Sequence, residues 1–259
     1  MADIRVLVSG SGRMGREVAA AVLAEDGMAP VGFVDGLAEA GVLEGLPLFD
    51  DAGKACDEVK PDVVIDFTNA AWTPTLAKAC IAKGVRLVVG TTGLSDDFLG
   101  WLEKETAANK TGAVVAANFA IGAVLMMYFA RLAAPYFEHA EIIELHHDAK
   151  IDSPSGTAKK TAELMRASRE KDFSHPDSEI EPLVGARGAE FGGVALHSVR
   201  LRGLVAHQEV IFGGLGQTLT IRHDTTGRDS FMPGVIMATR EVMKLDHLVV
   251  GLDALFGLS

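Results

Sequence analysis

Residues 4–15 read Ile-Arg-Val-Leu-Val-Ser-Gly-Ser-Gly-Arg-Met-Gly, and this stretch decides the fold. Its apolar start predicts a short buried strand, and the alanine-rich residues 16–25 predict a helix directly after the glycines. Asp35 stands twenty residues after Gly15, at the end of a second predicted strand over residues 31–34. A G-x-G-x-x-G pattern in this strand, turn, helix and acid context is typical of dinucleotide binding. The alternative is a glycine-rich turn that only packs tightly.

The first half of the chain continues this alternation of strands and helices. Apolar runs predict further buried strands at residues 63–67, 87–89 and 114–116. Helices are expected over about residues 73–83 and 95–109. Strands that alternate with helices form a parallel sheet covered on both faces. We therefore predict an α/β fold with an N-terminal Rossmann-type, doubly wound parallel sheet.

The second half changes character after Asn118. We expect helices at residues 122–134, 155–169 and 232–244, with a strand at 141–147 between the first two. Three short strands close together are expected before the last helix, at residues 197–202, 208–212 and 218–223. Consecutive strands joined by tight turns predict a second, α+β domain with a mostly antiparallel sheet. The predicted domains are residues 1–117, completed by 228–259, and residues 118–227. Connections near Asn118 and Gly227 would then form a hinge whose closure excludes water.

A second informative stretch, residues 144–158, reads Glu-Leu-His-His-Asp-Ala-Lys-Ile-Asp-Ser-Pro-Ser-Gly-Thr-Ala. Neighbouring residues of a strand point to opposite faces, so His146 and His147 cannot share one face. Ser155 before an alanine-rich run predicts a helix N-cap, and a helix N-terminus attracts a carboxylate or phosphate. Lys150 would add a charge or donate a proton there. The alternative is a plain connection with a solvated lysine and two histidines that satisfy local hydrogen bonds.

Composition limits the classes of function. The chain has 259 residues, 48% of them hydrophobic, which is enough for a packed core. Its formal charge of −11, with scattered Lys and Arg, argues against a nucleic-acid surface. Cys56 and Cys80 form neither a disulfide framework nor a metal spacing, so we expect a reducing compartment, the cytoplasm. We expect no signal peptide, and the uncharged residues 111–130 are interpreted as a strand, a turn and a helix rather than a membrane span.

Two further motifs end predicted strands, where a doubly wound sheet binds its ligand. They are Asp66-Phe67-Thr68 and Gly90-Thr91-Thr92-Gly93, and either could lie beside a nicotinamide and its ribose. The alternative is an ordinary turn whose hydroxyls bond to their own backbone. Asp35 would repel a 2′-phosphate, and Gly36 after it supplies no arginine. We therefore expect NADH to serve at least as well as NADPH.

At this point the whole chain resembles the 4-hydroxy-tetrahydrodipicolinate reductase (dihydrodipicolinate reductase) family. The order and spacing of its motifs carry the resemblance: Gly12-Arg13-Met14-Gly15-Arg16, Asp66-Phe67-Thr68, Gly90-Thr91-Thr92-Gly93, Ala117-Asn118-Phe119, Glu144-Leu145-His146-His147, Lys150 and Ser155-Gly156-Thr157-Ala158. One departure is that many members have one more residue in the glycine loop. This shifts which backbone amides meet the pyrophosphate.

The resemblance implies reduction of 4-hydroxy-tetrahydrodipicolinate to tetrahydrodipicolinate, in diaminopimelate and lysine biosynthesis, with NADH or NADPH. It implies that the cofactor is lined by Gly10, Ser11, Gly12, Arg13, Met14, Asp35, Gly90, Thr91, Thr92, Ala116, Ala117, Asn118 and Phe119. Phe67 and Thr68 join this lining from their position at a strand end. His146 and Lys150 would form the proton-donor system, and the substrate carboxylates would be held by His147, Lys150, Ser155, Gly156 and Thr157. The resemblance also implies a homotetramer through the antiparallel sheet, for which Val210 to Phe212, Leu219 and Ile221 would supply the surface.

Other classes of function stay open at this point. A metal hydrolase or metal-binding protein would use Glu144, His146, His147 and Asp148, although strand alternation separates the two histidines and no third ligand has a recognisable spacing. A nucleotide-sensing protein without turnover would keep the glycine loop but has no need for His146 together with Lys150. A dehydrogenase of another carbonyl substrate is the nearest alternative enzyme.

Overall fold

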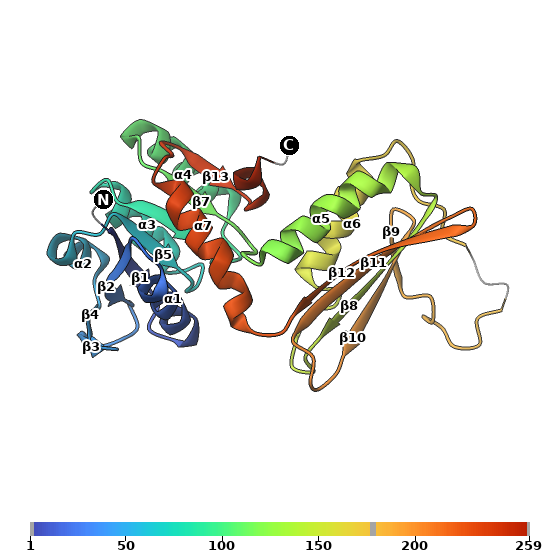
Figure 1. Cartoon of the computed structure of the whole chain (residues 1–259), viewed down its shortest axis with the longest axis horizontal. Helices are drawn as coiled ribbons and strands as arrows, with labels where there is room; N and C mark the ends of the chain where they lie inside the picture. The colour runs from blue at the N-terminus through green and yellow to red at the C-terminus, as the bar shows by residue number, and fades with distance from the viewer. Residues whose placement is uncertain (1–2, 177–179, 258–259) are drawn as a thin grey trace. The chain divides into compact units, whose positions relative to one another are not determined.

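The computed structural model describes residues 3–176 and 180–257. The chain divides into two compact units, Met1–Ile121 with Arg228–Ser259, and Gly122–Gly227 (Figure 1). Residues 1–2 and 258–259, which belong to the predicted nucleotide domain, lie outside the described part.

The N-terminal unit is built on an eight-stranded sheet within the described residues, in the order β13-β7-β6-β5-β1-β2-β4-β3. Every neighbouring pair is parallel except β3 with β4. The strands are β1 (Ile4–Ser9), β2 (Met28–Val34), β3 (Gly41–Leu43), β4 (Leu46–Phe49), β5 (Val63–Asp66), β6 (Arg86–Val89), β7 (Ala113–Val115) and β13 (Leu248–Val250). The predicted Rossmann-type parallel sheet is confirmed.

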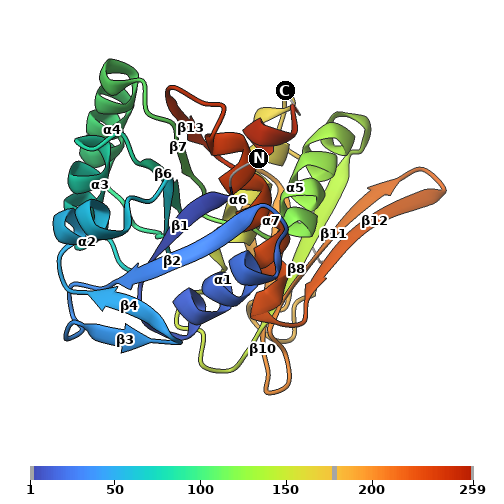
Figure 2. The same cartoon turned by 60° about the vertical axis from the view of Figure 1, so that its left-hand side comes forward.

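Helices cover both faces of this sheet (Figures 1 and 2). One face carries α1 (Arg13–Ala24) and α7 (Met232–Val242), and the other carries α2 (Ala52–Val59), α3 (Thr73–Ile81) and α4 (Asp96–Asn109). Short 3-10 turns, η2 (Arg228–Phe231) and η3 (Asp253–Phe256), flank α7 and β13. Leu7, Leu76 and Leu102 are fully buried in the core between the sheet and the second helix layer. This burial fixes the carboxyl ends of β1, β2, β5 and β6 at one edge.

Several elements of this unit escaped prediction. The hairpin of β3 and β4 turns at Glu44 and Gly45, both with positive φ (51° and 78°). A two-residue turn with two positive φ angles usually carries Asn-Gly or Asp-Gly, so Glu-Gly gives a weak signal. Pro47 inside β4 also weakens the sequence signal for a strand. Asp51 caps α2 by accepting a hydrogen bond from the Lys54 amide, at 2.7 Å, but Gly53 in the first turn masks the helix.

The second unit contains a five-stranded sheet in the order β12-β11-β8-β10-β9. Its strands are β8 (His139–His146), β9 (Ala189–Phe191), β10 (Val194–Arg200), β11 (Ala206–Gly214) and β12 (Gln217–Thr225). Helix α6 (Gly156–Ala167), the end of α5 (Ile121–Ala133) and η1 (Ala134–Tyr136) cover one face. The predicted second, mostly antiparallel sheet is confirmed.

Two details of the second sheet differ from expectation. Strand β10 pairs with β8 in parallel, because the chain between them carries α6 across one face of the sheet. Val210 and Phe212 are fully buried beneath α6, so they cannot supply an exposed association surface. Residue Ile211 between them points to the opposite, uncovered face, as strand alternation requires.

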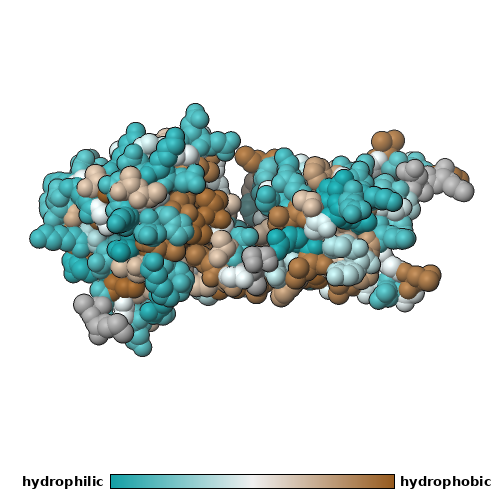
Figure 3. All heavy atoms as spheres, turned by 90° about the horizontal axis from the view of Figure 1, so that it is seen from above, coloured by the Kyte–Doolittle hydropathy of each residue, from teal (hydrophilic) through white to brown (hydrophobic). Residues whose placement is uncertain are grey.

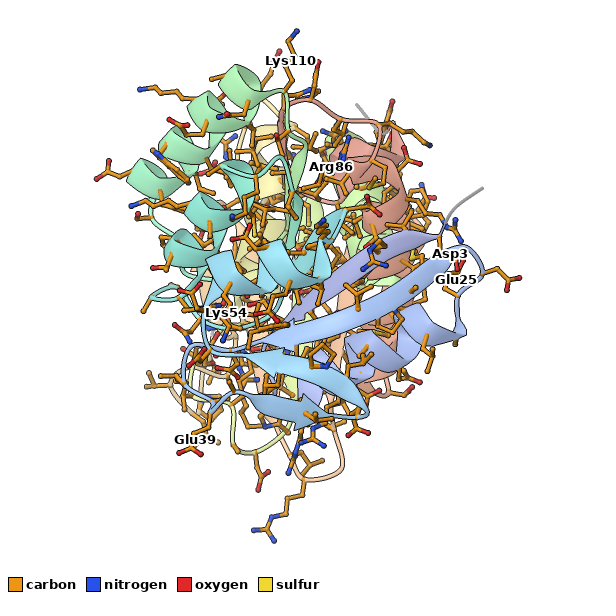
Figure 4. The ribbon with its side chains drawn as sticks, turned by 90° about the vertical axis from the view of Figure 1, so that its left-hand side faces the viewer. Asp3, Glu25, Glu39, Lys54, Arg86 and Lys110 are labelled. Carbon is orange, nitrogen blue, oxygen red and sulfur yellow. The ribbon has the colours of Figure 1, made fainter. Side chains whose placement is uncertain are left out.

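No helix among the described residues is both long and apolar enough to cross a membrane. The uncharged stretch 111–130 is divided between β7 and α5. Hydrophilic residues predominate on the visible surface of the N-terminal unit, at the left of Figure 3, with hydrophobic patches between them. In Figure 4 the labelled cations Lys54, Arg86 and Lys110 come from separate elements and lie apart.

Candidate active site

The glycine loop leaves the N-terminus of α1 open. The N-cap residue, Gly12, makes no side-chain cap, and the first turn of α1 contains no acidic residue. Gly10 has a φ of +107°, and a Cβ atom on Gly15 would lie 1.9 Å from the Gly10 carbonyl oxygen. A Cβ on Gly12 would meet nothing within 4 Å. The first amides of α1 have no helical carbonyl to bond to, and such amides can bind a phosphate group.

Asp35, one residue beyond β2, is hydrogen-bonded to the glycine loop. Its Oδ2 accepts hydrogen bonds from the Ser11 amide (2.9 Å) and the Ser11 hydroxyl (2.6 Å), and its Oδ1 accepts one from the Leu37 amide (3.0 Å). Burial acts to raise the pKa of Asp35, but these hydrogen bonds outweigh burial and lower it. The carboxylate is thus ionised, and a ribose that binds there would share it with Ser11.

A buried carboxylate organises the ends of β5 and β6. Asp66 is fully buried and accepts hydrogen bonds from three threonine hydroxyls: Thr68 (2.7 Å), Thr73 (2.6 Å) and Thr91 (2.9 Å). The Thr91 hydroxyl also accepts a hydrogen bond from the Thr68 amide, at 3.0 Å. Thr68 and Thr91 therefore fix the two loops to each other. The sequence signal for Asp66 was a carboxylate that directly ends an apolar strand.

The remaining predicted cofactor residues of this unit follow the same strand ends. Phe67 packs edge-on against Phe119, with ring centroids 5.4 Å apart, and a Cβ on Gly90 would lie 2.1 Å from the Phe67 ring. The Asn118 side chain accepts a hydrogen bond from the Ala120 amide, at 2.8 Å, which shapes the turn after β7. The surrounding positions differ in exposure: Ala116 is buried, whereas Thr92 and Ala117 are exposed.

A different group of side chains gathers in the second unit, around the end of β8. His146 Nδ1 lies 2.5 Å from Glu144 Oε2. Arg200 donates two hydrogen bonds to the Glu144 carboxylate, at 2.7 Å and 3.0 Å. The Glu144 side chain is 1% exposed and that of His146 is 15% exposed. Sequence reasoning missed Arg200, because it lies 56 residues beyond Glu144 and reaches it only through the pairing of β8 with β10.

The protonation of this pair follows from its surroundings. Burial acts to raise the pKa of Glu144, but hydrogen bonds from Arg200, Ser198 and His146 outweigh burial and lower it. Burial lowers the pKa of His146, and Lys150 and Arg200 lower it further, whereas Glu144 raises it. The imidazole is therefore neutral near pH 7, with Nδ1–H donating to the Glu144 carboxylate.

Lys150 and His147 lie on the loop after β8. Lys150 Nζ donates a hydrogen bond to Asp152 Oδ1, at 2.6 Å, and the Lys150 side chain is 21% exposed. The Lys150 amide closes a turn on the His147 carbonyl, at 3.2 Å. His147 itself is exposed, unlike His146. The two histidines therefore differ in exposure, but the predicted strand alternation does not separate them, because β8 ends at His146 and His147 lies on the loop.

The predicted helix start at Ser155 is confirmed. Ser155 is buried, has extended backbone angles (φ −65°, ψ 153°) and accepts a hydrogen bond from the Ala158 amide, at 3.2 Å. The first turn of α6 carries no acidic residue. The amides of Gly156 and Thr157 have no helical carbonyl four residues earlier to bond to, so they can hold an anion. A Cβ on Gly156 would meet nothing within 4 Å, so the space before the helix is open.

The predicted site residues thus form two groups, one in each unit. Gly10, Asp35, Thr68 and Gly90 follow neighbouring parallel strands at one sheet edge. His146, Lys150 and Ser155 belong to the loop and strand ends around β8 and α6. No group of three or more His, Cys, Asp or Glu residues in the described part of the chain could hold a metal ion.

Family models match both halves of the chain. The model described as "Dihydrodipicolinate reductase, N-terminus" matches residues 4–119, and the one described as "Dihydrodipicolinate reductase, C-terminus" matches residues 122–256. The chain belongs to the dihydrodipicolinate reductase family. A 4-hydroxy-tetrahydrodipicolinate reductase of Moorella thermoacetica is 49% identical over 264 aligned residues, covering 98% of each chain. One from Geobacillus thermodenitrificans is 50% identical, covering 96% of this chain and 98% of the relative.

Solved structures agree with this dihydrodipicolinate reductase family membership. A dipicolinate-bound dihydrodipicolinate reductase from Paenisporosarcina sp. TG-14 has a TM-score of 0.90 and 42% identity, covering 97% of this chain and 99% of that one. An amine dehydrogenase from Mycobacterium smegmatis has a TM-score of 0.66 at 13% identity, with 97% of this chain and 96% of that one covered, a likeness of fold alone.

Proposed function

We propose that this protein reduces 4-hydroxy-tetrahydrodipicolinate to tetrahydrodipicolinate with NADH or NADPH, a step of diaminopimelate and lysine biosynthesis. The observation that carries the proposal is the likeness, over nearly the whole chain, to relatives named for this reaction. Replacement of the 4-hydroxyl group by hydrogen consumes one hydride and one proton and releases one water molecule. The chain must therefore hold a hydride source, a dicarboxylate and a proton donor.

The N-terminal unit fits the hydride source, a reduced pyridine nucleotide, which supplies hydride from its nicotinamide when bound. Gly10, Ser11, Gly12, Arg13 and Met14 would hold the pyrophosphate at the start of α1, where no side chain caps the helix. Asp35 would bind the adenosine ribose. The nicotinamide end would be lined by the loops that Asp66 ties together and by the turn after β7, that is by Phe67, Thr68, Gly90, Thr91, Thr92, Ala116, Ala117, Asn118 and Phe119.

The second unit supplies groups for an anionic substrate. The amides of Gly156 and Thr157, with Ser155 as the cap, would hold one carboxylate, and His147 and Lys150 would hold the other. We assign proton donation to the Lys150 ammonium group. His146 with hydrogen on Nδ1 has an unprotonated Nε2, which accepts a hydrogen bond rather than donating a proton. His146 would then orient the substrate or Lys150.

The direct test is oxidation of NADH, followed by its absorbance, after addition of freshly made 4-hydroxy-tetrahydrodipicolinate. We expect turnover with this substrate and none with aspartate semialdehyde. Turnover with aspartate semialdehyde instead would indicate a dehydrogenase of another carbonyl compound. Binding of NADH without turnover of either compound would indicate a nucleotide-sensing protein.

The surroundings of Asp35 support NADH as a cofactor at least as good as NADPH. The ionised carboxylate would repel a 2′-phosphate. Gly36 cannot be replaced by a compensating arginine, because a Cβ there would lie 2.3 Å from the Trp72 ring. Trp72 is held in place by a hydrogen bond from its Nε1 to the Ser9 hydroxyl, at 3.0 Å. A hundredfold advantage of NADPH in kcat/KM would contradict this proposal.

We further propose that the protein is a homotetramer which associates through the face of the second sheet that α6 does not cover. This face carries Ile211 and an exposed ion-pair group in which Arg222 contacts Glu209 (2.8 Å) and Asp224 (3.0 Å). Of the predicted association surface only Ile211 lies on this face, because Leu219 and Ile221 pair with Phe212 and Val210 and share their face of the sheet. Sedimentation analysis tests the proposal: Ile211→Glu should yield smaller species than the wild type, and an unchanged mass would contradict it.

We infer that the protein acts in the cytoplasm on small molecules rather than on nucleic acid. Cys56 and Cys80 are both free and buried. The formal charge of −11 and the separation of the cations support a small-molecule substrate.

A further inference from the structure

We propose that Glu144, held by Arg200, is a positioning residue that fixes the ring of His146 with hydrogen on Nδ1 and anchors the start of α6 beside it. This inference rests on the proposed reduction and concerns the same site. Glu144 and Arg200 act on the proposed site through their contacts with His146, the Ser155 amide and the Asp152 carbonyl.

The first argument is the completeness of the contacts around the Glu144 carboxylate. Oε2 faces His146 Nδ1 (2.5 Å) and Arg200 Nη1 (3.0 Å), and Oε1 faces Arg200 Nη2 (2.7 Å) and the Ser155 amide (3.3 Å). A carboxylate buried to 1% exposure requires such compensation, because an unpaired buried charge is strongly destabilising.

The second argument is that these contacts join the segments of the site. Glu144 and His146 are two residues apart on β8, so their side chains share one face of the strand. The Ser155 amide links the same carboxylate to the first residue before α6. Arg200 Nη2 donates a further hydrogen bond to the Asp152 carbonyl, at 2.7 Å, on the loop that carries Lys150. One ion pair thereby connects β8, β10, the loop and the helix N-terminus.

The third argument is the direction of the hydrogen bonds. Arg200 and the Ser155 amide can only donate, so the carboxylate must accept from both. A charged carboxylate therefore requires His146 to present Nδ1–H, which leaves the Nε2 lone pair free for a donor in the site. A carboxamide at position 144 would turn donor hydrogens toward Arg200, His146 or Ser155. It would therefore lose the tautomer preference while changing the side-chain volume little.

The test combines the exchange Glu144→Gln with NMR of the imidazole nitrogens, in which a His146→Asn spectrum identifies the His146 signals. In the wild type we expect a neutral His146 with hydrogen on Nδ1. In Glu144→Gln we expect a mixture of tautomers and a kcat at least about tenfold lower, with the Kd for NADH unchanged. Arg200→Lys, which keeps the charge but loses the two-pronged contact, should fall between the two in kcat.

The chain offers a matched control in Glu141, which lies on the opposite face of β8. Glu141 also contacts an arginine and a histidine, Arg187 at 2.7 Å and His197 at 2.9 Å. Glu141→Gln should leave kcat and the His146 tautomer as in the wild type. Loss of kcat in both glutamine variants to the same extent would overturn the inference.

The wild-type spectrum alone also tests the positioning role of Glu144, even if Glu144→Gln fails to fold. A wild-type His146 with hydrogen on Nε2 would overturn the positioning role. If the wild type showed the Nδ1–H tautomer but no turnover of 4-hydroxy-tetrahydrodipicolinate, the proposed reaction would be wrong and the positioning of His146 would stand.

Discussion

Lys150 is the residue on which the proposed proton transfer depends. Exchange of Lys150 for Met removes the ammonium group that faces Asp152 while keeping most of the side-chain length. Loss of a general acid typically lowers the rate by about 10² to 10⁴, so kcat should fall within that range. The Kd for NADH should not change, because the cofactor groups belong to the other unit.

Steady-state kinetics and a fluorescence titration with NADH measure both quantities. Lys104→Met, an exchange of an exposed lysine on α4, serves as the control and should retain wild-type turnover. A kcat for Lys150→Met within threefold of the wild type would remove Lys150 from the proton-donor role.

His146 should also couple folding stability to pH. Its pKa in the folded state lies below the ordinary value of 6.5, mainly because of burial. The unfolded chain therefore binds more protons than the folded one as pH falls below about 6.5, and stability decreases in that window. The contribution is present above the unfolded pKa and is lost as pH falls through the folded pKa.

Urea unfolding of the wild type at several pH values between 7.5 and 5 measures this slope. The variant His146→Asn has no titrating ring at this position, so its stability should fall less steeply over the same range. Identical slopes for the two proteins would show that His146 does not contribute.

Residues were predictable where their role depends on neighbours in sequence. Ser155 was identified as an N-cap because the signal, a serine before an alanine-rich run, is local. Arg200 was not, since its contact with Glu144 exists only after β8 and β10 pair in parallel. Asp66 had a local position at a strand end, but its three threonine partners could not be inferred from spacing.

At the scale of elements, the N-terminus of α6 should contribute to both stability and substrate binding. Ser155→Ala removes the cap on the Ala158 amide and a polar group beside the proposed substrate site. Loss of such a cap costs about 0.5–2 kcal/mol of unfolding free energy. We also expect a higher KM for 4-hydroxy-tetrahydrodipicolinate, because the freed end of the helix holds the carboxylate less rigidly.

Ser95 provides a matched control, since its hydroxyl caps α4 in the other unit by accepting from the Phe98 amide, at 3.2 Å. Both variants should lose stability in urea unfolding, but only Ser155→Ala should raise the substrate KM. An equal change of KM in the two variants would mean that the effect comes from general loss of stability.

Elements were predictable where hydrophobic period and capping agree. Helix α6 after β8 satisfies both, since Ser155 caps it, whereas α1 was predictable from the glycine motif between two apolar segments. The hairpin of β3 and β4 was not predicted, because its turn carries Glu44 at a positive φ rather than the asparagine or aspartate that usually marks such a turn. Strand β13 was not predicted, because a three-residue edge strand is defined by its pairing with β7 rather than by its own sequence pattern. The parallel pairing of β10 with β8 was not predicted, because it depends on the crossover through α6.

At the scale of the whole molecule, the proposed cofactor and substrate groups belong to different compact units. The chain passes between these units twice, at residues 121–122 and at residues 227–228. The proposed hydride transfer requires the nicotinamide and the substrate to be bound at the same time. Each ligand should therefore favour the binding of the other.

We predict that NADH strengthens the binding of pyridine-2,6-dicarboxylate, a planar dicarboxylate that stands in for the substrate, by at least about fivefold. Because binding free energies are linked, the dicarboxylate must strengthen NADH binding by the same factor. Isothermal titration of each ligand with and without the other gives both factors. The variant Lys150→Met should bind the dicarboxylate more weakly, whereas NADH alone should bind as in the wild type. A coupling factor of one in the wild type would mean that the two ligands bind independently, which would contradict the predicted coupling.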